Sequence, residues 1–126
     1  MVGQGSPGSA DGGEGGWLEA APEFAHAREL WERGEFWEVH EALEPLWMRL
    51  EGERREAVHG LILLAAALHK ARSSPTGGWR NFAKALRHLE GLPGVYAGLD
   101  LSETVAEVWR ALERPGYRPR LCTASP

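Results

Sequence analysis

The most constraining feature of this sequence is an uninterrupted apolar run, Leu61-Ile-Leu-Leu-Ala-Ala-Ala-Leu68. The run lies within a longer segment, Glu53 to Arg72, which has a helical pattern and is followed by Ser73-Ser74-Pro75. A helix that is apolar on every side is buried on every side, so this segment predicts the centre of a helical bundle. The run is far too short to span a membrane, and we expect no membrane association.

Glycine and proline divide the rest of the chain into further helical segments with short connections. No segment alternates strictly between apolar and polar residues, so we expect no sheet. The predicted fold class is therefore all-α, a compact bundle of about five helices. Besides the central helix, the expected helices are one from Pro22 to the stop at Gly34, one over Phe36–Leu50, one carrying Trp79, Phe82, Leu86 and Leu89, and one that begins at an Asp100/Glu103 capping box and carries Leu101, Val105, Val108 and Leu112.

The composition changes sharply at the N-terminal end. The first sixteen residues contain seven glycines and no large side chain beyond Met1 and Val2. Such a segment buries too little apolar surface to offset its loss of conformational entropy. We therefore expect a flexible tail over 1–16, a single helical domain over 17–117 and a C-terminal tail over 118–126.

The net charge indicates which partners are disfavoured, and the cysteine content indicates the cellular compartment. A net charge of −4 disfavours a nucleic-acid-binding protein, although Arg80, Lys84 and Arg87 form a local basic strip. The single cysteine, Cys122, has no partner for an internal disulfide, and no signal peptide pattern begins the sequence. We expect a cytoplasmic protein.

The segment 36–47, Phe-Trp-Glu-Val-His-Glu-Ala-Leu-Glu-Pro-Leu-Trp, holds the candidate functional residues. Wound as a helix, it places His40 and Glu44 one turn apart on the apolar side, flanked by Trp37 and Trp47. Ionisable groups in apolar surroundings are costly unless they are paired, hydrogen-bonded or metal-bound. We therefore expect His40 and Glu44 to be mostly buried and hydrogen-bonded to another helix.

The spacing His40-Glu41-x-x-Glu44 suits one divalent, zinc-like ion. His40 and Glu44 would be ligands, and Glu41 would be the general base beside the bound water. A third ligand has to come from another helix, with His59, His69 and His88 as candidates. His59 and His69 lie roughly 15 Å apart along one helix, so they cannot share an ion, and we favour His69.

Two other interpretations of these residues stay open. In the first interpretation, His40 and Glu44 form a buried structural pair and bind no metal. In the second, Glu23-x-x-His26 and Glu56-x-x-His59 provide the spacing used by di-iron bundles, although short acidic helices often contain it by chance.

Three blocks of the sequence resemble a small bacterial and archaeal family, domain of unknown function 309. They are Gly34-x-Phe36 with Trp37-Glu38-Val39-His40-Glu41-x-Leu43-Glu44-x-x-Trp47, then Gly60-Leu61-Ile62-Leu63 with Ala65-Ala66-Ala67-Leu68-His69, and Arg80-Asn81-x-x-Lys84-Ala85. The resemblance covers about Phe24 to Leu112. It implies an all-helical domain of a family often labelled as predicted metal-dependent hydrolases, and it carries over His40, Glu41, Glu44, Trp47 and His69. His59 departs from the family pattern, where glutamine is expected.

Two functions follow as hypotheses, and the sequence leaves open whether the protein is an enzyme. The first is a metal-dependent hydrolase of a small polar substrate, with the residues named above. The second is a non-catalytic bundle that forms a homo-oligomer or binds a partner, with the His/Glu motif in a structural role.

Overall fold

The computed structural model describes residues 15–124 and contains, within them, five helices and one short ribbon. The expected all-α bundle is confirmed. The Gly-rich segment predicted as a tail lies outside the described residues, apart from Gly15 and Gly16. None of the described helices is long and apolar enough to cross a membrane. The elements are α2 (Pro22–Glu32), α3 (Phe36–Met48), α4 (Gly52–Ala71), α5 (Pro75–Leu89), β1 (Val95–Tyr96), β2 (Leu99–Asp100) and α6 (Leu101–Glu113).

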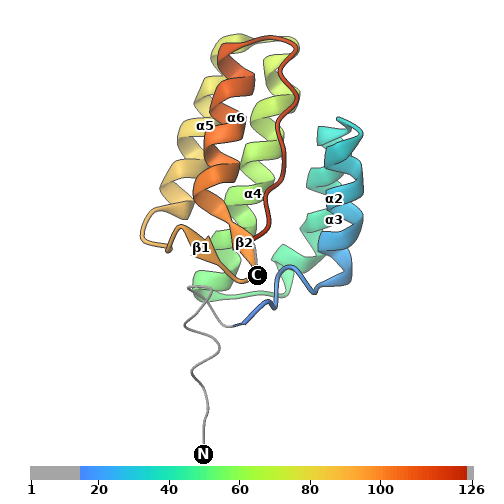
Figure 1. Ribbon diagram of the computed structural model, residues 1–126, viewed down its shortest axis with the longest axis vertical. Helices are drawn as coiled ribbons and strands as arrows, with labels where there is room; N and C mark the ends of the chain where they lie inside the picture. Colours follow the sequence, from blue (N-terminus) through green and yellow to red (C-terminus); the bar gives the residue numbers. More distant parts are fainter. Residues whose placement is uncertain (1–14, 125–126) are drawn as a thin grey trace, which may run out of the picture.

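The apolar helix α4 lies at the centre of the bundle, as predicted. It contacts α3 on one side, α5 on another and α6 on a third, while α2 packs against α3 (Figure 1). Gly78 in α5 allows a close approach to the backbone of α4, because a Cβ atom there would lie 2.8 Å from the Cβ of Ala71 and 3.1 Å from the carbonyl oxygen of Ala67. The core that results includes Leu61, Leu64 and Ala65 of α4, which are almost completely buried.

The expectation of no sheet is wrong in one place, where β1 and β2 form an antiparallel ribbon between α5 and α6. Val95 pairs with Asp100 and Tyr96 pairs with Leu99. The turn between them uses Ala97 and Gly98, both with positive φ, which is typical of two-residue hairpins. Strands of two residues are too short to produce an alternating pattern, so the sequence carried no signal for them.

The segment after α6 returns along the bundle between α6 and the α2–α3 pair (Figure 1). Two buried polar residues of α6 hold it. Glu107 accepts hydrogen bonds from the hydroxyl of Tyr117 at 2.7 Å and from the backbone N–H of Arg120 at 2.9 Å. Thr104 accepts one from the backbone N–H of Cys122 at 3.0 Å. The part of the predicted C-terminal tail that is described, 118–124, therefore lies packed against the domain.

Candidate functional site

The orientation of α3 determines where the His/Glu motif lies. The helix buries Phe36, Val39, Leu43 and Leu46 against its neighbours, a stripe with the spacing of one helix face. His40 and Glu44 lie beside this stripe, so His40 is half-buried and Glu44 is exposed. The expectation that both are mostly buried is wrong, because burial follows the four apolar side chains and leaves the His40/Glu44 side at the surface.

Trp37 links His40 to the far end of α4. Its ring centroid lies 4.9 Å from that of His40, in an edge-to-face arrangement, and 5.5 Å from that of His69. The Trp37 side chain nevertheless remains 44% exposed. An indole that contacts two imidazoles at the surface presents an apolar ring together with a polar N–H edge.

A second group of rings lies at the other end of α3. The ring of Trp47 packs 5.2 Å from that of His59, and His59 lies 3.9 Å from the ring of His88 of α5. The Nδ1 atom of His88 contacts Glu56 Oε1 at 2.7 Å, and the guanidinium of Arg55 lies 4.1 Å from the centroid of Trp47.

The surroundings of His59 favour its neutral form. Burial lowers the pKa of His59 below its ordinary value of 6.5, and positive charge on His88 lowers it further. Glu56 acts in the opposite direction but does not outweigh burial. His59 is therefore a neutral group near neutral pH that packs against the rings of Trp47 and His88.

The two groups of rings lie on α3, α4 and α5, one group at each end of α3, and we call them together the histidine face. It contains four of the five histidines of the chain. The members of the histidine face are Trp37, His40, Trp47, His59, His69 and His88. Glu41 and Glu44, both exposed, border it on the α3 side.

The structure does not bring the expected metal ligands together as a donor group within the described residues. No group of three or more His, Cys, Asp or Glu side chains that could hold a metal ion occurs within residues 15–124. His40 and His69 each contact the Trp37 ring and Glu44 is exposed, and within residues 15–124 these three side chains do not belong to a donor group that could hold an ion. The Nδ1 atom of His40 is buried without a hydrogen-bond partner among the described residues. One such atom does not make a metal site.

From the sequence, His59 is a doubtful ligand and His88 only an alternative one, yet both belong to the histidine face. The spacing does contain a signal for His59, because Glu56, His59 and Leu63 lie on the same side of α4. The contact with His88 was not predictable, because it depends on how α5 packs against α4.

The comparisons with known proteins agree with this fold. The family model described as Domain of unknown function (DUF309) matches residues 24–82, which include α2, α3, α4 and half of α5. A crystal structure of a conserved hypothetical protein from Thermus thermophilus is 45% identical in sequence, with a TM-score of 0.67. The match covers 74% of this chain and 98% of the Thermus chain. The chain belongs to the DUF309 family.

A further relative comes from Aquifex aeolicus (strain VF5) and is described as an uncharacterized protein. It is 32% identical over 79 residues, which is 61% of this chain. The match covers only 24% of the Aquifex protein, so this chain corresponds to about a quarter of that relative's length. The descriptions of the Thermus and Aquifex proteins name no activity.

Proposed function

We propose that this DUF309 domain is a non-catalytic self-association module, and that two copies pair through the histidine face. The observation that carries the proposal is the placement of opposite charges on the two helices that border this face. Exposed Glu41 and Glu44 lie on α3, and exposed Arg80 and Lys84 lie on α5, with α4 between the two helices.

The helix directions make this surface self-complementary. Trp37 at the start of α3 contacts His69 at the end of α4, so these helices are antiparallel. Gly77 near the start of α5 approaches Lys70, and Gly60 approaches Leu89, so α5 is also antiparallel to α4. A two-fold axis parallel to α4 and lying in the surface therefore brings α3 of one copy onto α5 of the other, twice.

The charges also lie at matching heights. Trp47, His59 and His88 mark one level across the three helices, because their rings pack together. From that level, Glu44 lies about 4.5 Å along α3 and Lys84 about 6 Å along α5, in the same direction. Glu41 and Arg80 follow at about 9 Å and about 12 Å. The two-fold arrangement thus pairs Glu44 with Lys84 and Glu41 with Arg80 of the second copy.

The centre of the proposed interface is apolar and allows close approach. Leu63 and Ala66, both half-buried, lie on the surface side of α4 between the two charged edges. Small and aliphatic residues at a helix contact let a partner helix pack closely. Exposed Trp37 adds an aromatic group of the kind enriched at interfaces.

A metal-dependent hydrolase acting on a small polar substrate is the second proposal, with His40, Glu44 and His69 as ligands and Glu41 as base. Only the resemblance and the buried, unpaired Nδ1 atom of His40 favour it. The module proposal gains support from the Aquifex relative, in which the matched segment is a small part of a longer chain. We propose a cytoplasmic location for either function, since Cys122 is a free thiol.

Sedimentation equilibrium of the full chain tests the proposal. We expect a reversible dimer that the Leu63→Glu variant converts to monomer, because the change buries charges near the two-fold axis. Leu86→Glu is the control, since Leu86 is an exposed leucine of α5 that is not among the residues of the histidine face. A wild-type monomer at all concentrations would contradict the proposal, and so would a dimer that persists in folded Leu63→Glu.

A further inference from the structure

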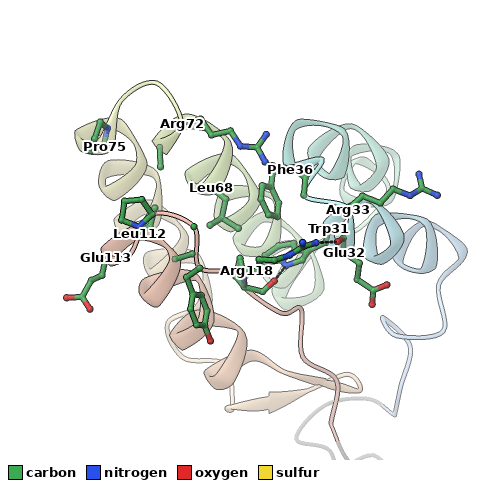
Figure 2. A pocket seen from close by; sticks show the side chains of 17 residues that line it. Trp31, Glu32, Arg33, Phe36, Leu68, Arg72, Pro75, Leu112, Glu113 and Arg118 are labelled. Carbon is green, nitrogen blue, oxygen red and sulfur yellow. Dashed lines mark hydrogen bonds between the residues drawn. The ribbon is translucent and has the colours of Figure 1, made fainter.

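A cleft of about 610 Å³ is lined by residues that do not belong to the histidine face. It opens where the end of α2 and the start of α3 face the ends of α4 and α6 (Figure 2). The segment Pro115–Pro119 forms one wall, held in place by the hydrogen bonds of Glu107. Its size is in the range of small-molecule sites.

The floor of the cleft is apolar and rigid. Trp31, Phe36 and Leu68 line it and are themselves well buried, and Figure 2 shows Leu112 on the opposite wall. The Trp31 ring is fixed by a hydrogen bond from its Nε1 to the carbonyl oxygen of Pro119 at 2.9 Å. It also packs edge-to-face on Phe36, with 5.4 Å between the centroids. A flat apolar group can therefore enter without displacing a polar partner.

Three arginines line the cleft, and Figure 2 shows the Arg33 side chain pointing away from the floor, which leaves Arg72 and Arg118 at its rim. The Arg72 guanidinium lies 5.1 Å from the centroid of Phe36 and donates one hydrogen bond to the carbonyl oxygen of Gly34. Arg118 donates one to the carbonyl oxygen of Glu32 at 3.4 Å. Because a guanidinium has five N–H donors, both arginines retain donors for a further acceptor.

The carboxylates near the cleft do not neutralise these arginines. The Glu32 carboxylate pairs with Arg28 at 3.6 Å, and in Figure 2 the Glu32 and Glu113 side chains point away from the floor. A planar carboxylate can accept two parallel hydrogen bonds from a guanidinium. A neutral ligand would leave the positive charges of the two arginines without a counter-charge. From these contacts we propose that the cleft binds a small amphipathic monocarboxylate, with its apolar body on Trp31, Phe36 and Leu68 and its carboxylate at Arg72 and Arg118.

Cinnamate and its neutral isostere cinnamamide are suitable probes, titrated into the full chain and followed by NMR. We expect saturable shifts of the Trp31 indole N–H with cinnamate, and about tenfold weaker binding of cinnamamide because charge-assisted hydrogen bonds are lost. Arg72→Gln should weaken cinnamate binding to a similar extent. Arg87→Gln, an exposed arginine of α5 outside the cleft, should leave it unchanged.

A second variant, Ala111→Phe, should fill part of the cleft with a larger side chain, because Ala111 is a half-buried residue on its wall. It should reduce binding of both probes while the circular dichroism spectrum stays that of the wild type. The proposal is overturned if cinnamate causes no saturable shift in the wild type, or if cinnamamide binds equally well. It is also overturned if Arg72→Gln, folded as the wild type, retains full affinity.

Discussion

The hydroxyl of Tyr117 donates a 2.7 Å hydrogen bond to the Glu107 carboxylate, a group that is only 1% exposed. Arg110 donates to the same oxygen at 2.8 Å, and the Arg120 backbone donates to the other at 2.9 Å. Burial by itself would raise the pKa of Glu107, but the hydrogen bonds from Tyr117 and Arg120 outweigh it and lower the pKa. One ionised side chain of α6 thus holds the C-terminal segment.

Glu107→Gln should lower the free energy of unfolding by about 3 kcal/mol, since removing one partner of a buried charged network leaves the others uncompensated. Urea denaturation measures the change. Glu103→Gln is the control, because Glu103 is far more exposed and meets Arg110 only at 3.4 Å, so its loss should be small. Equal stability of the two variants would show that Glu107 does not hold the segment.

Acidification should destabilise the fold through His59. Its pKa is lowered in the folded chain, so the unfolded chain binds protons more readily as the pH falls below 6.5. Stability is therefore full above that pH and declines as the pH falls toward the lowered folded pKa. The groups that face His59 are His88, Glu56, Arg55 and His40.

Thermal unfolding at a series of pH values checks this expectation. His59→Gln should lose less stability than the wild type between neutral pH and the acidic side of the histidine range. His26→Gln, a change at an exposed histidine of α2, should follow the wild type. If the His59→Gln curve runs parallel to that of the wild type, burial of His59 has no part in the pH dependence.

The contact between α4 and α5 should depend on Gly78. Gly78→Ala is expected to destabilise the protein by about 1–2 kcal/mol, because the new Cβ meets the backbone and Cβ of Ala71. Gly77→Ala, one residue away, meets chiefly the side chain of exposed Lys70, which can move. Chemical denaturation should therefore separate the two variants, and a Gly78→Ala protein as stable as Gly77→Ala would refute the close approach.

The bundle was largely predictable from sequence because its helices are marked by strong local signals. The apolar run Leu61–Leu68 identified the centre, and Asp100 was correctly expected to cap α6, accepting a hydrogen bond from the backbone N–H of Glu103 at 2.9 Å. The β-ribbon was missed because two-residue strands have no periodicity.

The candidate site was less predictable, because its geometry depends on packing between helices. His40 and Trp37 were identified from one helix, and their contact follows from their spacing. The exposure of Glu44 depends on which stripe of α3 turns inward, and the stacking of His59 on His88 depends on α5. The role of Glu107 was also hidden, because its partners come from an irregular segment.

Metal binding by His40, Glu44 and His69 stays a prediction of the motif spacing and of the resemblance, and it conflicts with the module proposal. Because the three side chains do not form a ready donor set, we expect zinc to leave the melting temperature unchanged, with or without chelator. Differential scanning calorimetry of the wild type, His40→Ala and the control His26→Ala decides the matter. A zinc-dependent increase that His40→Ala alone abolishes would favour the hydrolase proposal.

The most direct test of self-association through the histidine face is a charge-reversal series followed by sedimentation velocity. The Glu44→Lys variant and the Lys84→Glu variant each place like charges together twice across the proposed two-fold axis, so each should be monomeric. The double variant restores opposite charges and should dimerise again. Glu29→Lys, a change at an exposed residue of α2, should remain dimeric. If the double variant stays monomeric while folded, or if the single variants dimerise like the wild type, the proposed pairing of α3 with α5 is wrong.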